Sequence, residues 1–388
     1  MIKIPEKIEY VIETLLKNGY AAFIVGGCVR DSLMGKTPDD FDVTTSAKPE
    51  DVQNLFEKTV PTGIKHGTIT VMVDKTPVEV TTFRTESGYS DNRHPESVNF
   101  VSDIKEDLSR RDFTVNAIAY NKCDGIVDFF EGGADINRKL LRAVGEPEKR
   151  FREDALRILR LFRFASTLCF SCEENTLNAA LKCSGGLEKI SSERIFTELY
   201  KAAKGENFKA IAPLIEKGGL NFLKITKTTD FEKITKADSP TLAFFMFLHF
   251  SSEDLSETLA YLKVSNKLKN YCLNLKKMLA LPNLKTKADL KTLMCEYGTE
   301  YILDYLKLKG ILEKTDISNL ISLYNEIIKN NEPYLINHLN ISGETLQNLG
   351  YNGKQIGKIL KRLQQEVILN PKLNQKEKLI EKLNKISP

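Results

Sequence analysis

Two aspartates separated by a single residue are the first feature of this sequence that could do chemistry. They are Asp40 and Asp42, on either side of Phe41. If Phe41 lies on a β-strand, both carboxylates point to one face of the sheet and Phe41 points to the other. Two like charges side by side are unfavourable unless a cation lies between them, and Mg²⁺, a hard ion that prefers oxygen ligands, suits this pair. The alternative is a solvated turn, because the preceding Pro38 and Asp39 are turn-forming residues.

The segments on either side of this pair favour a site that handles phosphate. Upstream, an apolar run at residues 21–25 ends in Gly26 and Gly27, and Arg30 follows within a predicted helix. Glycines let the backbone approach a phosphate closely, and a helix start and a guanidinium both offer donors to its oxygens. Downstream, Glu79 alternates with two valines, so it can face the same site from a neighbouring strand. Together these residues indicate nucleotidyl transfer by two metal ions.

The elements that must position these residues predict an α+β protein, with an N-terminal head that holds a small β-sheet and helices, followed by an all-α body and tail. The β-branched runs at residues 68–73 and 78–83 predict a hairpin, and residues 21–25 and 41–44 predict two further strands. Within the head, one of the predicted helices covers residues 113–119. From residue 152 onward the apolar spacing is mostly helical. The clearest helices there are predicted at residues 155–164, 192–203, 208–216, 254–261 and 317–328.

The composition excludes several classes of protein. The chain has 388 residues, of which 41% are hydrophobic and 28% are charged, as in ordinary globular proteins and unlike disordered or collagen-like ones. The longest apolar stretch, residues 242–248, is too short to span a bilayer. The first residues do not resemble a signal peptide, and seven cysteines do not suggest a secreted disulfide framework. We therefore expect a cytoplasmic protein with no membrane partner.

Charge is distributed unevenly along the chain. Residues 1–150 hold 20 Lys+Arg against 25 Asp+Glu, whereas residues 151–388 hold 36 against 27. An acidic first part and a basic second part are expected where a metal site adjoins a surface that binds a polyanion. The alternative is that the Lys-rich helices are simply solvated.

Four segments resemble successive motifs of the class II tRNA nucleotidyltransferases, which belong with the bacterial poly(A) polymerases in one superfamily. They are GGCVRDSLMGKTPDDFDVTT, VEVTTFR, RRDFTVNAIAY and RFREDALRILRLFRFA, in the family's order. Residues 339–369 also resemble the family's C-terminal region. The resemblance implies a nucleotidyltransferase head (1–145) followed by three helical parts, which are a nucleobase-recognition neck (146–205), a body (206–330) and a tRNA-binding tail (331–388).

The resemblance also implies roles for individual residues. Asp40 and Asp42 would hold Mg²⁺, with one ion activating the RNA 3′-hydroxyl and the other stabilising the leaving pyrophosphate. Glu79 would be the third acid. The triphosphate would be held by Gly27 and Arg30, and the sugar and phosphates would lie near Arg111, Asp112 and Asn116.

Asp154 and Arg157 are predicted to read the nucleobase. Three residues apart on a helix, they would project from the same face. Aspartate accepts hydrogen bonds and arginine donates them, so the pair matches the amino group and ring nitrogen that cytosine and adenine both present. Uracil and guanine present a carbonyl and an N–H there, so both contacts would fail. An ordinary salt bridge between the two side chains is the alternative.

Two sets of basic residues are further candidates for contact with triphosphate or RNA. Arg157, Arg160 and Arg163 share a helical spacing and would form a stripe. Residues 351–388 hold nine Lys+Arg against three Asp+Glu. The candidates there for contact with the tRNA backbone, on the elbow side, are Lys354, Lys358, Lys361 and Arg362. A solvated amphipathic helix is the alternative.

We therefore predict an enzyme that adds or repairs the 3′-terminal CCA of tRNA without a nucleic-acid template, from CTP and ATP and with Mg²⁺. Because the Asp–Arg pair suits both C and A, an A-adding tRNA nucleotidyltransferase or a poly(A) polymerase is the alternative. In the family a mobile loop is shortened in enzymes that add only CC. Residues 86–95 here have full length, which favours an enzyme that completes CCA or adds A over one that adds only CC. An inactive tRNA-binding protein is the alternative from another class. The oligomeric state does not follow from the sequence.

Overall fold

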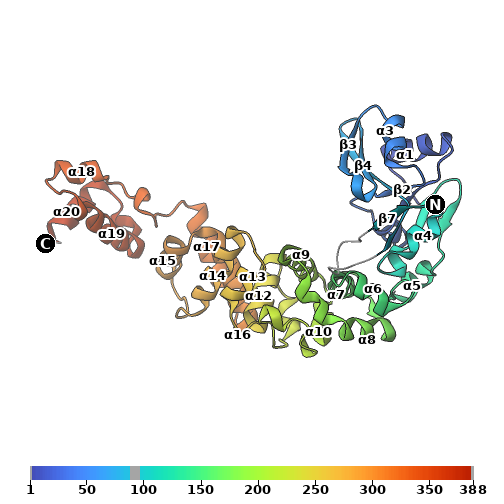
Figure 1. Ribbon diagram of the computed structural model, residues 1–388. Helices are drawn as coiled ribbons and strands as arrows, with labels where there is room; N and C mark the ends of the chain where they lie inside the picture. The colour runs from blue at the N-terminus through green and yellow to red at the C-terminus, as the bar shows by residue number, and fades with distance from the viewer. Residues whose placement is uncertain (1, 88–96, 386–388) are drawn as a thin grey trace. The chain divides into compact units, whose positions relative to one another are not determined.

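The structure is a computed structural model that describes residues 2–87 and 97–385, so most of the predicted loop at residues 86–95 lies outside the described residues. Contacts divide the chain into two compact units, one of Met1–Thr235 with Met246–Val264 and one of Lys236–Phe245 with Ser265–Pro388. In Figure 1 the labelled strands lie in the blue and cyan segments, and the green to red segments are helical. The predicted α+β head with an all-α remainder is confirmed. The finer division into four parts stays a prediction.

The head contains a seven-stranded sheet with the order β3-β4-β5-β2-β1-β8-β9. Neighbouring strands are antiparallel except for β2 and β5, which are parallel. β1 is buried along its whole length, which explains its continuous apolar sequence. The strands are β1 (Ala22–Val25), β2 (Val43–Thr45), β3 (Thr59–Gly63), β4 (Thr68–Val73), β5 (Thr76–Thr82), β8 (Ala119–Asn121) and β9 (Gly125–Val127).

The predicted hairpin is confirmed as β4 and β5. Its two turn residues, Asp74 and Lys75, have φ values of 46° and 67°. Positive φ at both positions matches the right-handed twist of the flanking strands, as in the commonest two-residue hairpin turns. Two short sheets complete the strands, namely β6 (Arg84–Ser87) with β7 (Ser97–Phe100) and β10 (Leu140–Leu141) with β11 (Ser171–Cys172).

The prediction of a helix at residues 113–119 is wrong. Only Thr114–Asn116 form a single 3₁₀ turn, after which the chain enters β8. The carbonyl of Ile118 accepts a hydrogen bond from the Gly26 N–H at 3.0 Å, and Ile118 is fully buried. Pairing with β1 therefore overrides the helical spacing of this segment, as tertiary contacts often override local preference.

Helices make up most of the remainder of the first unit. The predicted helix at 155–164 is α7, which packs against α9, and the helix predicted at 254–261 is α13. The helices are α1 (Glu6–Lys17), α2 (Gly27–Leu33), α3 (Pro49–Leu55), α4 (Ile104–Ser109), α5 (Gly132–Arg138), α6 (Pro147–Glu153), α7 (Leu156–Leu168), α8 (Glu174–Lys182), α9 (Ser192–Ala202), α10 (Ala212–Glu216), α11 (Phe231–Ile234) and α13 (Leu255–Tyr261).

The second unit is helical throughout its described part. Its C-terminal helices enclose a core that includes Leu346, Leu363 and Leu379. The apolar run at residues 242–248 lies in α12 (Pro240–Ser251), which the two units share, and is buried. Among the described helices, none is both long enough and apolar enough to cross a membrane. The remaining helices are α14 (Asn266–Leu279), α15 (Lys287–Tyr297), α16 (Ile302–Glu313), α17 (Ser318–Lys329), α18 (Gly343–Asn348), α19 (Lys354–Leu369) and α20 (Lys376–Lys385).

Candidate active site

The aspartate pair lies just before β2 rather than within it. The expectation that Phe41 is on a strand is wrong, because β2 begins at Val43. The polar residues before Val43 stay exposed, which ends the regular strand there. The carbonyl of Asp42 nevertheless accepts a hydrogen bond from the Val25 N–H at 3.1 Å. Asp42 is therefore attached to the end of β1, and Asp40 lies two residues earlier in the exposed segment.

Glu79 lies on β5, the parallel neighbour of β2. Val43 and Val80 are partners in this register, and both are buried. Continued by one residue before β2, this register places Asp42 beside Glu79, and both of these residues are exposed. Since successive side chains on a strand alternate between faces, the two carboxylates share the face opposite the valines. The register thus places Glu79 on the strand beside the aspartate pair, and its role as a third acid stays a prediction.

The negative charge of Asp40 affects the ionisation of Asp42. Loss of water around its carboxylate raises the pKa of Asp42, the negative charge of Asp40 raises it further, and Arg111 opposes both effects. A cation bound between the carboxylates would relieve this repulsion. Within the described ranges, no cluster of three or more His, Cys, Asp and Glu could hold a metal ion. The pair therefore fits an ion such as Mg²⁺, which commonly takes one or two carboxylates and completes its shell with substrate phosphates and water.

The glycine turn after β1 brings the backbone close to Arg111. Gly26 has a φ of +80°, and a Cβ there would lie 3.0 Å from Nη1 of Arg111. At Gly27, which begins α2, a Cβ would lie 3.7 Å from its nearest neighbour, Nη2 of Arg30, which is an ordinary contact. The position that requires glycine is therefore Gly26 rather than Gly27, to which the sequence assigned the phosphate contact.

Asp112 is the centre of a buried network that joins three more of the predicted residues. Its Oδ1 accepts from Nδ2 of Asn116 at 3.1 Å, and its Oδ2 pairs with Nη2 of Arg160 at 2.6 Å. Nη1 of Arg30 donates to Oδ1 of Asn116 at 2.6 Å. Burial alone would raise the pKa of Asp112, but the charge of Arg160 and the bond from Asn116 lower it to about 2. The network therefore keeps Asp112 ionised and holds Arg30 and Asn116 in place.

Arg111 is held by Asp107, which was not identified from the sequence. Asp107 is fully buried and pairs with Arg110 at 2.7 Å and with Arg111 at 3.4 Å. Its Oδ1 also accepts from the backbone N–H of Arg84 at 3.3 Å. Burial raises the pKa of Asp107, but the two arginines outweigh this and lower it overall. A fixed carboxylate thus anchors the guanidinium that lies against Gly26.

Asp154 and Arg157 do not share a helix, so that part of the prediction is wrong. α6 ends at Glu153, α7 begins at Leu156, and Asp154 lies between them in an extended conformation. Its Oδ1 accepts from the Leu156 N–H at 3.0 Å, and its Oδ2 accepts from Nη2 of Arg194 at 3.0 Å. An aspartate that bonds to the first N–H groups of a helix favours a position outside the helix, which explains the break.

Arg157 is buried and held by other partners. Its Nη1 donates to Oε2 of Glu153 at 3.1 Å, and its Nη2 donates to the carbonyl of Arg110 at 2.8 Å. Among the described residues, Asp154 therefore forms its ion pair with Arg194, and Arg157 forms its ion pair with Glu153. The salt bridge considered as the alternative does not form, and both side chains are fixed separately.

The predicted stripe of arginines on α7 is neutralised within the protein. Arg157 pairs with Glu153, Arg160 with Asp112, and Arg163 with Glu198 at 2.5 Å. Three guanidinium groups also surround the ring of Phe164, with centroid distances of 5.2 Å for Arg30, 5.3 Å for Arg160 and 3.9 Å for Arg163. The stripe is therefore a set of arginines paired within the protein rather than a free basic surface.

Four charged residues that bind predicted site residues were not themselves identified as site residues from the sequence. Glu153 and Asp107 lie four residues or fewer from the arginines that they bind, so helical spacing could have found them. Arg194 and Glu198 lie on α9, more than 30 residues from their partners. No pattern within the sequence connects segments so far apart.

Three family models match the chain. They are described as the poly A polymerase head domain (residues 22–142), a probable RNA and SrmB-binding site of polymerase A (169–223) and a putative tRNA nucleotidyltransferase domain 2 (232–383). The CCA-adding enzyme of Staphylococcus haemolyticus is 37% identical over 381 residues, which cover 95% of each chain. This chain belongs to the CCA-adding enzyme family.

Further relatives agree with membership of the CCA-adding enzyme family. The CCA-adding enzyme of Ligilactobacillus salivarius is 37% identical over 97% of this chain and 95% of its own. The crystal structure of the Bacillus stearothermophilus CCA-adding enzyme in complex with CTP superposes with a TM-score of 0.83 and 30% identity over 98% of both chains. The predicted resemblance and the prediction of a nucleotidyltransferase are confirmed, and the family implies use of a divalent metal ion.

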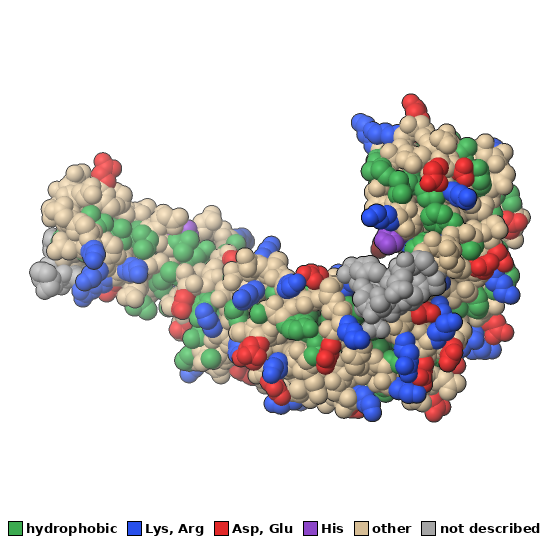
Figure 2. All heavy atoms as spheres, in the orientation of Figure 1, with side chains coloured by type: hydrophobic (Ala, Val, Ile, Leu, Met, Phe, Trp, Pro, Cys, Tyr) green, Lys and Arg blue, Asp and Glu red, His purple; other side chains and the backbone are tan. Residues whose placement is uncertain are grey.

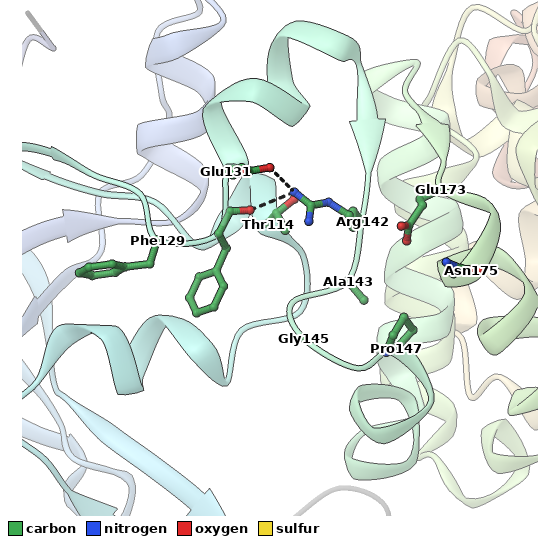
Figure 3. Close-up of a pocket in the computed structure, with 10 residues that line it drawn as sticks. Thr114, Phe129, Glu131, Arg142, Ala143, Gly145, Pro147, Glu173 and Asn175 are labelled. Atoms are coloured by element: carbon green, nitrogen blue, oxygen red, sulfur yellow. Dashed lines mark hydrogen bonds and ion pairs between the residues drawn. The ribbon is translucent and has the colours of Figure 1, made fainter.

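Figure 3 shows a cavity of about 470 Å³ in the first unit. It is lined by Thr114 and Arg142, among others, and by none of the residues predicted for catalysis or nucleotide binding. Arg142 is held by Asp135 at 2.9 Å, by the more distant Glu131 at 3.6 Å and by the carbonyl of Phe130. The arginine of this lining is therefore already paired, and the cavity is not our candidate active site.

The basic residues of the tail lie on the exposed side of α19. Opposite them, Leu363 and Val367 are buried in the C-terminal core. Within the described residues no side-chain bond or ion pair ties down the four candidates, which are Lys354, Lys358, Lys361 and Arg362. On the face of the molecule drawn in Figure 2, Lys and Arg side chains are interspersed with Asp and Glu.

We expect the ionisation of Asp112 to make the free energy of unfolding depend on pH. The pKa of Asp112 is about 2 in the folded protein and about 3.9 in an unfolded chain. The ionised carboxylate therefore stabilises the fold above pH 4, and this stabilisation, ~2 kcal/mol, is lost as the pH falls through 2. In Asp112→Asn this contribution is absent at every pH. The difference in free energy of unfolding between wild type and variant should shrink by roughly half of that amount between pH 7 and pH 3.

Denaturant titration at pH 7, 5 and 3 measures this difference. The exposed Asp39→Asn serves as the control, and its difference from wild type should stay constant over the same range. A constant difference for Asp112→Asn as well would show that Arg160 and Asn116 do not lower the pKa of Asp112.

Proposed function

We propose that this enzyme adds or repairs the 3′-terminal CCA of tRNA, taking CTP and ATP as substrates and releasing pyrophosphate. The observation that carries the proposal is the pair Asp40 and Asp42 beside Glu79, at the end of β1 and the start of β2. The two neighbouring aspartates provide paired negative charge of the kind that a divalent metal binds. The names of the relatives that share nearly the whole chain support CCA addition as the reaction. A cytoplasmic location stays the prediction made from the sequence.

Asp40 and Asp42 would hold Mg²⁺ in this proposal, with Glu79 as the third acid. When bound, such ions activate the 3′-hydroxyl of the RNA and stabilise the charge of the leaving pyrophosphate. The chain itself keeps Asp42 accessible while binding its backbone to β1, so the carboxylate is presented on a fixed support. Arg111, which lies against Gly26, adds positive charge beside the aspartates.

The nucleotide would be bound by the residues around the Asp112 network. Arg30 and Arg111 offer guanidinium donors for the triphosphate at the glycine turn that contains Gly27. Asp112 and Asn116 offer an acceptor and a donor to the ribose. Arg160 and Arg163 would complete the cationic side of the site. Each of these arginines is already fixed by a carboxylate or an amide, so the nucleotide would meet a preorganised set of charges.

Asp154 and Arg157 would read the base from two separately fixed positions. Each carboxylate oxygen of Asp154 accepts one bond in the structure and retains a lone pair for the amino group of cytosine or adenine. Arg157 would donate to the adjacent ring nitrogen. Uracil and guanine would place a carbonyl against Asp154 and an N–H against Arg157, which leaves polar groups unpaired and disfavours their binding.

Asp42→Ala should abolish incorporation of both CMP and AMP. Loss of a metal ligand removes several kcal/mol of transition-state stabilisation, so we expect a decrease in rate of about a thousandfold or more. Binding of tRNA, measured by fluorescence anisotropy, should change little. The exposed neighbour substitution Asp39→Ala is the control and should retain activity. Full activity of Asp42→Ala would contradict the metal assignment.

Substitution of Asp154 or Arg157 by alanine should relax the choice among the four nucleoside triphosphates. We expect the preference for CTP over UTP, measured as a ratio of kcat/KM values, to fall by about tenfold or more. Glu148→Ala on α6 is the control, since this residue pairs with Lys182 away from Asp154. Unchanged discrimination in the Asp154 and Arg157 variants would refute base reading by this pair.

Removal of charge from α19 should weaken binding of tRNA. Each phosphate contact that is lost lowers the slope of log affinity against log salt by roughly one. We therefore expect the triple substitution of Lys358, Lys361 and Arg362 by alanine to reduce both affinity and slope. The control replaces three exposed lysines of the head, Lys17, Lys58 and Lys75. If affinity and slope in the α19 variant match the wild type, the tail does not bind RNA through this face.

A further inference from the structure

The guanidinium of Arg194 is the charged group bonded directly to the carboxylate proposed to read the base. Arg194 lies on α9, 40 residues beyond Asp154, and its Nη2 donates to Oδ2 of Asp154 at 3.0 Å. Both side chains are mostly buried, with 29% and 18% of their surfaces exposed. We propose that Arg194 is a positioning residue for base selection, which fixes Asp154 as an oriented hydrogen-bond acceptor. This inference rests on the proposed role of Asp154 in reading the base.

The carboxylate of Asp154 is held at both of its oxygens. The Leu156 N–H binds Oδ1 from the start of α7, and Arg194 binds Oδ2 from α9. A single bond would leave the carboxylate free to rotate, whereas two bonds from different elements fix its plane. Selection between an amino group and a carbonyl depends on where the acceptor lies, so a fixed plane is a condition for discrimination.

Arg194 is also chemically suited to an aspartate that must act as a hydrogen-bond acceptor. An ionised aspartate only accepts hydrogen bonds, but a protonated one carries an O–H that could donate to the carbonyl of uracil or guanine. Arginine only donates hydrogen bonds, so it pairs with the carboxylate as an acceptor. Other arginines nearby are engaged elsewhere, since Arg157 pairs with Glu153 and Arg160 with Asp112. Among the described residues, this leaves Arg194 as the ion-pair partner of Asp154.

Packing alone does not explain Arg194. Its Nη1 is buried and has no hydrogen-bond partner in the described part of the chain. An unpaired buried donor destabilises a fold, so its presence in a native protein calls for a specific explanation, of which a role in function is one. One turn later on α9, Glu198 binds Arg163 of α7. α9 therefore supplies one charged contact to the base-reading carboxylate and a second to the arginine cluster.

The test compares Arg194→Gln and Arg194→Lys with wild type in single-nucleotide incorporation with each of the four triphosphates. Glutamine removes the charge and the fixed fork, so we expect the KM for CTP and ATP to rise about tenfold and the preference for CTP over UTP to fall about tenfold. That size matches one charge-assisted hydrogen bond. The kcat at saturating CTP should change less than about threefold, since Arg194 does not touch the reacting atoms. Lysine keeps the charge and one donor, so its preference for CTP should be intermediate.

Lys263→Gln is the matched control. It removes a different cation bound to α9, one that pairs with Glu193 at 3.0 Å on the exposed side. Its KM values and its CTP preference should equal those of wild type. If the glutamine variant does not fold, the lysine variant decides the question, because an unchanged CTP preference there would overturn the proposal.

Two further outcomes separate this inference from the proposed function. An equal loss of rate with all four nucleotides in Arg194→Gln would show a structural role only and would overturn the inference. Asp154→Ala is measured beside it. If Asp154→Ala relaxes discrimination and Arg194→Gln does not, only the role of Arg194 fails. If neither variant changes discrimination, base reading by Asp154 fails as well.

Discussion

A charge removed from water must be paired, and this constraint organises the candidate active site. α7 carries three largely buried arginines, and each is matched by a carboxylate from a different segment, namely Glu153, Asp112 and Glu198. Breaking such a pair leaves an uncompensated buried charge, so each pair fixes its two segments against each other. The first family motifs and the helical segment after residue 146 are thereby held in one arrangement.

The opposite situation holds at the aspartate pair. Asp40 and Asp42 are left exposed and close enough to repel, and Arg111 is the positive charge that opposes this repulsion at Asp42. A site with unrelieved negative charge has affinity for a cation, whereas the neutralised arginine cluster has a fixed geometry. The two parts of the site therefore serve different needs, since metal binding requires unpaired charge and recognition of a base requires groups that do not move.

Much of this arrangement could be predicted from the sequence because it depends on local pattern. The β4–β5 hairpin, the helical second part and the segments around Asp40 and Arg157 all carry short-range signals. Three local predictions of secondary structure were wrong, at residues 113–119, Phe41 and Asp154, and a distant contact explains the first of them. Residues 113–119 pair with β1 instead of forming a helix, and the carboxylate of Asp154 caps α7 instead of joining it. Arg194 could not be found at all, because it meets Asp154 only after α9 has packed on α7.

The most direct test of the account supplies purified protein and Mg²⁺ with tRNAs that lack CCA, end in one C or end in both. Each tRNA receives CTP, ATP or both, and products are resolved at single-nucleotide resolution. The account predicts that CCA is completed on the shortest tRNA and that addition then stops. Addition of A alone to the CC-ended tRNA, long A tracts on unrelated RNA, or no addition at all would contradict it.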